Sequence, residues 1–284
     1  MTPAYSLWVL EYAAVPNYPQ SGLIYGMHNQ GTRKLPYCYV VIKGQGQLAM
    51  VDVGYNHKAH GEVLANTYGV RGWHPPHEVL GEIGVKPGDI SNIFITHCHF
   101  DHMGNIEDFP NATFYLQERE LSKWVWSMSL HRRFRWLMLG IDPADIMRAV
   151  DLARQGRLVS VDGDRENVLP GVDLHAAFDT HTWGSMYVTV RNDLATNSQS
   201  SWVFCGDLAY TQENLRGHDP NDPLTRLIGH HGEAASSFEG GRGRVFVDGK
   251  EWAAELVGDG PLAPGGRIEV VALVGGARLK VRAA

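Results

Sequence analysis

Residues 96–105, THCHFDHMGN, place the tightest constraint on what this chain can fold into. They follow a short apolar run at residues 93–95 that reads as a buried strand. Three imidazoles and a carboxylate lie within six residues, at His97, His99, Asp101 and His102. Neutral imidazole and carboxylate are good ligands for zinc and its neighbours, so a sharp turn after the strand would gather these groups on metal. A chance cluster of surface histidines is the competing interpretation, and the apolar run before the cluster argues against it.

The spacing also divides the four side chains into two pairs. His97 and His99 alternate along an extended segment and therefore project to one side. Asp101 and His102 fall beyond the expected bend and can serve a second ion.

The rest of the chain to about residue 226 has the pattern of an α/β protein of layered sheets with helices outside. Strand-like runs and a helical middle, which we expect to form two or three helices, support this. The strand runs are residues 37–42, 48–53, 93–96, 112–116, 158–161, 172–178, 186–190 and 202–205; the helical patterns are residues 78–83 and 118–154.

After about Arg226 the character of the sequence changes. Short strand patterns follow one another closely, and Asp248-Gly249 between two of them is a strong hairpin signal. We therefore predict a catalytic domain over residues 1–225 and a small all-β domain over residues 226–284.

Composition excludes several classes of protein. The net charge is −6, from 25 basic and 31 acidic residues, so the broad basic face that nucleic acid requires is not expected. Cysteine is odd in number, at Cys38, Cys98 and Cys205, which argues against a disulfide framework and favours a cytoplasmic protein. No run approaches the roughly 20 apolar residues of a membrane span, and the N-terminal run lacks the features of a signal peptide.

The segment at residues 97–102 resembles the signature of the metallo-β-lactamase superfamily. Three further positions resemble that family in order and spacing: Asp52 before Gly54, His181 in DTHTWGS, and Asp207 in FCGD. The resemblance implies an αβ/βα sandwich and two divalent metal ions, with zinc as the expected metal. It further implies that His97, His99 and His181 bind one ion, Asp101 and His102 the other, and Asp207 both.

Single residues carry less weight than the cluster. His181 alone could be an ordinary loop residue, and Asp207 alone a helix cap. Asp52 is either a residue that orients a metal ligand or a plain turn-forming aspartate.

Within the superfamily, residues 206–215, GDLAYTQENL, resemble the N-acyl-homoserine lactonases, in which a tyrosine at the place of Tyr210 contacts the substrate. A core aromatic residue is the alternative for Tyr210. The resemblance implies a hydrolase that opens a small-molecule lactone by attack of a hydroxide shared by the ions, with Asp101 as proton shuttle. Trp124, Trp126, Phe134 and Trp136 either wall an acyl pocket or belong to the core.

Two departures leave other functions open. The superfamily normally has one more histidine ligand near the end of the domain, whereas no histidine follows His230 and His231 here, and those two only weakly resemble it. Residues 226–284 instead resemble the OB-type barrel of NfeD-like proteins, which implies a sandwich without its usual closing elements. The barrel could support a homodimer or a protein partner. The alternatives are therefore another esterase, thioesterase or phosphodiesterase, or a disabled metal-binding adaptor.

Overall fold

The computed structural model describes residues 4–24, 27–198, 200–215, 227–238, 240–258, 260–274 and 278–284. These form two compact units, Met1–Gln20 with Gly31–Tyr210, and Ser21–Gln30 with Thr211–Ala284. The domain boundary expected between residues 225 and 226 lies outside the described residues. Mixed α/β content in the first unit and a barrel in the second agree with the fold class expected from the sequence.

The first unit is built on a six-stranded sheet in the order β1-β2-β3-β4-β5-β6. β1 to β3 pair antiparallel and β3 to β6 pair parallel. The strands are β1 (Tyr5–Pro19), β2 (Thr32–Gly44), β3 (Gln47–Val51), β4 (Asn92–Phe94), β5 (Thr113–Gln117) and β6 (Leu158–Val161). The parallel half is typical of strands joined by helical crossovers, and it sends the carboxyl ends of β3, β4 and β5 to one edge.

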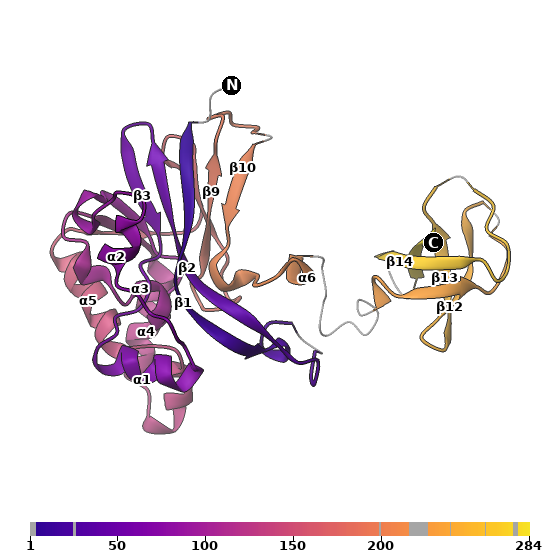
Figure 1. Ribbon diagram of the computed structural model, residues 1–284, viewed down its shortest axis with the longest axis horizontal. Coiled ribbons are helices and arrows are strands. Elements are labelled where there is room, and N and C mark those ends of the chain that lie inside the picture. Colours follow the sequence, from indigo (N-terminus) through magenta and orange to yellow (C-terminus); the bar gives the residue numbers. More distant parts are fainter. Residues whose placement is uncertain are drawn as a thin grey trace. The chain divides into compact units, whose positions relative to one another are not determined.

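Side-chain alternation along these strands makes two cores. Met50 and Ile93 pack on one face with the helices, whereas Val51 and Phe94 pack on the other face. The helices lie together on one side of this sheet (Figure 1). They are α1 (Ala59–Tyr68), α2 (Pro76–Gly81), α3 (Phe100–Met103), α4 (Glu118–Met128) and α5 (Pro143–Arg154), with 3₁₀ turns η2 (Pro87–Asp89), η3 (Ile106–Asp108) and η4 (Arg132–Met138). A further 3₁₀ turn, η1 (Gln20–Gly22), follows β1.

A second, antiparallel sheet in the order β10-β9-β8-β7 packs against the opposite face of the first. Its strands are β7 (Arg165–Leu169), β8 (Val172–Ala176), β9 (Met186–Arg191) and β10 (Ser201–Phe204), followed by η5 (Gly206–Leu208) and α6 (Gln212–Leu215). Within the described residues β10 pairs only with β9, and Trp202 and Val203 are exposed. Among the described residues no strand pairs with the outer side of β10, as expected for a sandwich without its closing elements.

The second unit contains a closed five-stranded barrel in the order β11-β12-β13-β15-β14, with β14 also paired to β11. Its strands are β11 (His231–Ala234), β12 (Arg242–Val247), β13 (Lys250–Leu256), β14 (Arg267–Val274) and β15 (Arg278–Ala283). Asp248 and Gly249 both have positive φ, 50° and 71°, which confirms the predicted hairpin between β12 and β13. An apolar core that includes Val245, Ile268 and Leu279 fills the barrel.

Among the described residues, each helix is too short or too polar to cross a lipid bilayer.

Candidate metal centre

The cluster predicted from residues 97–102 lies where β4 ends and α3 begins. His97 follows the buried strand, and His99 precedes the first residue of α3. The backbone N–H of Phe100 donates to the carbonyl of Gly140 at 2.8 Å, which holds the turn against the segment between η4 and α5. The sharp turn that the sequence required is therefore present.

His181 and Asp207 come from the second sheet. His181 lies on the loop between β8 and β9, as predicted, and Asp207 lies in η5 after β10. The chain can approach so closely because Gly206 has a φ of +52°, and a Cβ there would lie 2.9 Å from Oγ1 of Thr96. Glycine thus allows the two sheets to present their ligands to one point.

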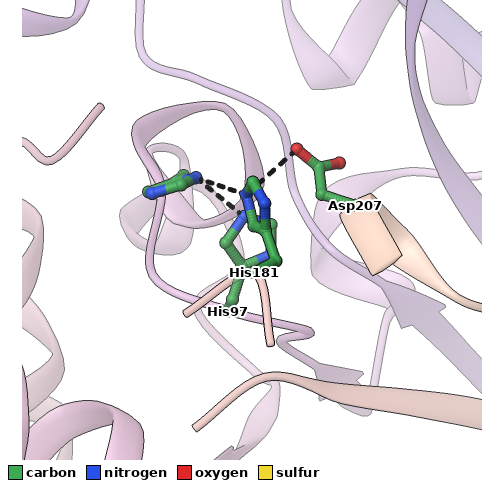
Figure 2. Close-up of side chains that lie close together, drawn as sticks. His97, His181 and Asp207 are labelled. Carbon is green, nitrogen blue, oxygen red and sulfur yellow. Dashed lines mark hydrogen bonds and ion pairs between the residues drawn. The ribbon is translucent and has the colours of Figure 1, made fainter. Parts of the chain in front are cut away.

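Four side chains converge at this point. One ligand atom of each of His97, His99, His181 and Asp207 lies within 4.8 Å of the others. Nδ1 of His99 is 3.0 Å from Nε2 of His97 and 3.0 Å from Nε2 of His181, and His181 Nε2 is 3.4 Å from Asp207 Oδ2. Figure 2 shows His97 and His181, with the carboxylate of Asp207 directed at His181.

Asp101 and His102 lie next to this group. His102 Nε2 is 3.2 Å from Asp207 Oδ1 and 3.6 Å from Asp101 Oδ2. All six residues expected to bind metal are therefore brought together, with Asp207 facing both sets.

Burial controls the protonation of three of the histidines. It lowers the pKa of His97 and of His181, and it lowers the pKa of His99 to about 3. These rings are therefore neutral at pH 7, and neutral imidazole is the form that binds metal.

For His102 and Asp207, neighbouring charges outweigh burial in setting the pKa. Burial acts to lower the pKa of His102, but the carboxylates of Asp207, Asp101 and Asp52 outweigh it and raise that pKa. Burial raises the pKa of Asp101 to about 6, whereas His102 outweighs burial and holds the pKa of Asp207 below its usual range. A negative pocket thus faces a set of neutral ring nitrogens.

This donor set fits a divalent cation. The ring nitrogens of His97 and His181 both approach one nitrogen of His99, which can make only one such hydrogen bond with its single proton or lone pair. Neutral imidazoles and carboxylates are the donors that zinc and related ions prefer.

Asp52 contacts two residues of the 96–102 segment through its carboxylate. Oδ1 accepts the backbone N–H of Thr96 at 2.7 Å, and Oδ2 lies 2.8 Å from both the Thr96 hydroxyl and Nδ1 of His102. His102 therefore donates from Nδ1 to Asp52 and directs Nε2 toward Asp207 and Asp101. Asp52 also has a φ of +61° where the chain leaves β3. Its hydrogen bonds to Thr96 and His102 fit the predicted role of orienting a metal ligand.

Glu120, which the sequence analysis missed, ties the two ligand loops together. Its carboxylate is fully buried and accepts four hydrogen bonds. Oε1 accepts from Cys98 N–H at 2.9 Å and from the Trp124 indole at 2.7 Å. Oε2 accepts from Gly184 N–H at 2.7 Å and from the Thr182 hydroxyl at 2.8 Å. Cys98 lies between two of the histidines and Thr182 follows His181. The available signal was helical spacing, which places Glu120 on the same face as Trp124.

A cavity of about 550 Å³ opens beside the cluster. Its floor includes His99, Asp101, His102, His181 and Asp207. Its walls are largely apolar and come mainly from β1 and β2; they include Val9, Tyr18, Leu35, Tyr37, Tyr68 and Leu139. Tyr210 also lines the cavity, and its hydroxyl donates to Asp207 Oδ2 at 2.8 Å.

The four aromatic residues considered for an acyl pocket do not line this cavity. Trp124 is buried in the core under His99, with ring centroids 6.2 Å apart, while Trp126 and Trp136 are exposed. Helical periodicity correctly predicted that this region is helical, with Trp124 and Trp126 in α4 and Phe134 and Trp136 in η4. It could not show that β1 and β2 would form the cavity wall.

His230 and His231 make their contacts within the barrel unit. His230 Nδ1 lies 3.0 Å from Asp248 Oδ1, and His231 begins β11 opposite Glu269. Neither belongs to the cluster of metal-binding groups found among the described residues.

Comparison with known proteins agrees with this geometry. Residues 31–247 match the family model described as the metallo-beta-lactamase superfamily, and residues 224–282 match that of the NfeD-like C-terminal, partner-binding domain. N-acyl homoserine lactonase AiiA of Bacillus thuringiensis subsp. kurstaki is 26% identical over 206 residues, covering 67% of this chain and 73% of its own. AiiB of Agrobacterium fabrum is 27% identical over 142 residues, covering 48% and 47%.

Solved structures show the same fold. An N-acyl homoserine lactone hydrolase with the product N-hexanoyl-L-homoserine at its catalytic metal centre superposes with a TM-score of 0.57 at 21% identity, covering 78% of this chain and 84% of that chain. The dizinc lactonase AidC superposes with a TM-score of 0.51 at 16% identity, covering 72% and 71%. With the family match and the cluster of His97, His99, His181 and Asp207, the chain belongs to the metallo-beta-lactamase superfamily as a metallo-hydrolase, and it carries an NfeD-like C-terminal domain.

Proposed function

We propose that the protein hydrolyses lactone rings and that N-acyl-homoserine lactones are its substrates. The observation that carries this proposal is the position of Tyr210, whose hydroxyl contacts Asp207 inside a cavity with a metal-binding floor and apolar walls. A polar lactone ring would lie on the floor, and an acyl chain would lie along Tyr18, Leu35 and Tyr37. Relatives and structural neighbours named as N-acyl homoserine lactonases support the same substrate class.

We assign two divalent ions, expected to be zinc, to the six clustered residues. His97, His99 and His181 would hold one ion, Asp101 and His102 the other, and Asp207 both. When bound, such ions supply a Lewis acid for the carbonyl and lower the pKa of water toward neutrality.

The residues of the chain supply positioning and proton transfer. The Asp101 carboxylate takes a proton from the attacking water and returns it to the leaving alkoxide. The Tyr210 hydroxyl, freed from Asp207, donates to the substrate carbonyl oxygen as negative charge develops there. The apolar walls exclude water from the acyl chain.

Lactone turnover tests the proposal. A pH-indicator assay would follow acid release from homoserine lactones of different acyl length, beside plain esters, thioesters and phosphodiesters. We expect turnover of acyl-homoserine lactones, a loss of about 10²–10⁴-fold in Asp101→Asn, and a smaller loss in Tyr210→Phe. Asp89→Asn, on the exposed η2 turn, is the matched control. Full activity in Asp101→Asn would remove its role as proton shuttle, and turnover of another ester class alone would reject the lactone substrate.

One observation favours a second candidate. No histidine follows His231, so the ligand that the superfamily usually adds late in the chain is absent from this sequence. A catalytically disabled metal-binding adaptor is therefore the alternative. Metal analysis separates the two, because about two ions per chain with turnover supports the enzyme and one ion or none without turnover supports the adaptor.

We also propose the domain assignment, with residues 1–225 as catalytic domain and residues 226–284 as barrel. The family description of the barrel as partner-binding supports a role in holding a second copy or another protein. Size-exclusion chromatography with light scattering, on the full chain and on a chain ending at residue 225, would measure that contribution.

A further inference from the structure

We propose that an exposed basic and apolar surface beside the cavity binds the surface of an anionic lipid membrane. This surface, named here the η4 surface, comprises His131, Arg132, Arg133, Arg135, Trp136 and Leu139. The inference concerns where the protein acts and does not depend on the substrate proposed above.

All six side chains of the η4 surface are exposed. A 3₁₀ helix has three residues per turn, so residues three apart lie above one another. Arg132 and Arg135 therefore form one row, which ends at the buried Met138, and Arg133 and Trp136 form the next; Leu139 follows the helix in extended backbone and is exposed. Phe134 and Leu137 form the third row, and both are partly buried. The η4 segment thus turns one side inward and presents cations and apolar groups together on the outside.

The charge of this surface is uncompensated. The chain has a net charge of −6, yet no acidic residue lies between Glu120 and Asp142. Arg132, Arg133 and Arg135 form no ion pair with any carboxylate of the described residues. Lys123 on the neighbouring helix α4 adds a further cation, which lies 5.3 Å from the ring centroid of the exposed Trp126.

The apolar members decide which anionic partner fits. Trp136 is 63% exposed and Leu139 is 67% exposed, so both present apolar surface to water. A nucleic acid would neutralise the arginines but offer nothing apolar to Leu139. A membrane interface accepts both kinds of group at once, because basic side chains attract anionic head groups while Trp and Leu enter the acyl boundary. Charge complementarity and exposed apolar groups together therefore point to anionic lipid.

The η4 surface also borders the cavity. Leu139 and Gly140 line it, and a Cβ at Gly140 would lie 3.3 Å from the ring of His99. Val9, which is 64% exposed, also lines the cavity. Docking on lipid would therefore bring the cavity mouth to the membrane surface.

Vesicle flotation of the full, metal-loaded protein tests this inference. The probes are vesicles of phosphatidylcholine alone and vesicles of phosphatidylcholine mixed with phosphatidylglycerol. We expect binding to the anionic vesicles only, and we expect added salt to weaken it. The triple variant Arg132→Gln, Arg133→Gln and Arg135→Gln should partition on the order of 100-fold more weakly, since each basic residue near such a surface contributes about a factor of five.

The matched control removes the same charge elsewhere, with Lys43→Gln, Lys86→Gln and Arg165→Gln, all exposed positions of the same unit. It should float like wild type. Trp136→Ser should weaken binding with the charge intact, which a purely electrostatic contact would not do. Equal flotation of both triple variants, or no flotation of wild type with anionic vesicles, would overturn the inference. So would retention of single-stranded RNA by the η4 surface without vesicle binding, which would identify nucleic acid instead.

Discussion

Glu120→Gln is the sharpest test of how this protein holds its metal-binding residues. The carboxylate of Glu120 accepts hydrogen bonds from both ligand loops, whereas an amide keeps only one accepting oxygen. We expect the amide nitrogen to take the position of Oε2, because the Thr182 hydroxyl there can turn away and bond Ser185 Oγ at 2.7 Å. The N–H of Gly184 would then be left buried without an acceptor.

The structure sets the size of this effect. One buried donor without a partner costs about 1–3 kcal/mol, and the hydrogen bond lost from Thr182 adds about 1 kcal/mol, so we expect a loss of about 2–4 kcal/mol in unfolding free energy. Because the damage falls on the loop of His181, metal affinity should fall about 10–100-fold, as it does when groups that support metal ligands are removed. Glu120→Ala would leave all four donors without an acceptor, at a cost of about 1 kcal/mol each or more. The total is a large share of the unfolding free energy of a typical protein, about 5–15 kcal/mol.

Urea unfolding and metal competition against a chromogenic chelator measure the two effects separately. Glu118→Gln is the matched control, since Glu118 lies in the same first turn of α4 and is exposed. If Glu120→Gln binds metal and unfolds like Glu118→Gln, the reasoning is refuted. A stability loss without any loss of metal affinity would show that Glu120 supports the fold but does not position His181.

Four further predictions follow from the same contacts. Asp52→Asn should lower metal affinity about 10–100-fold, because Asp52 no longer accepts from His102, and chelator competition would show it; unchanged affinity would contradict this. Removing metal with a chelator should lower the melting temperature, and restoring zinc at about 1,000 times its Kd should raise the unfolding free energy by about 4 kcal/mol. A melting temperature that does not change on chelation would argue against a filled site. Burial raises the pKa of Asp145 to about 7, so the native state holds a proton between about pH 4 and pH 7 that the unfolded chain has released, and stability falls as pH rises through this window. Between pH 5 and pH 8, urea titrations should therefore show a larger fall in unfolding free energy for wild type than for Asp145→Asn. Equal falls would refute the raised pKa of Asp145. Val203→Lys should reduce association through the open edge of β10, measured by light scattering, and an unchanged aggregate fraction would show that this edge is not used.

Four of the candidate metal ligands could be predicted from the sequence because they lie in one short segment. His97, His99, Asp101 and His102 lie within six residues, so one turn after β4 suffices to gather them. His181 and Asp207 depended on resemblance, since spacing alone does not show that loops of the second sheet reach this turn. Their positions in the structure agree with that expectation.

Groups that act through long-range contacts could not be predicted. Glu120 looks like any acidic residue in the first turn of a helix, and only the packed structure shows its four donors. The strand β1 was also missed, because its apolar run was considered only as a terminal segment, yet it pairs with β2 over most of its length. Helix α1 had no clear apolar stripe to reveal it. Such elements are defined by partners distant in the chain, which periodicity does not encode.

The closed ring of the barrel has an evolutionary consequence. Its five strands hydrogen-bond to one another in sequence positions 231–283, so the ring closes without borrowing a strand from the hydrolase sheets. A gene segment encoding such a self-sufficient module can be joined to another reading frame at a single point. The edge strand β10, which among the described residues pairs only with β9, lacks that self-sufficiency and keeps backbone groups available to another strand.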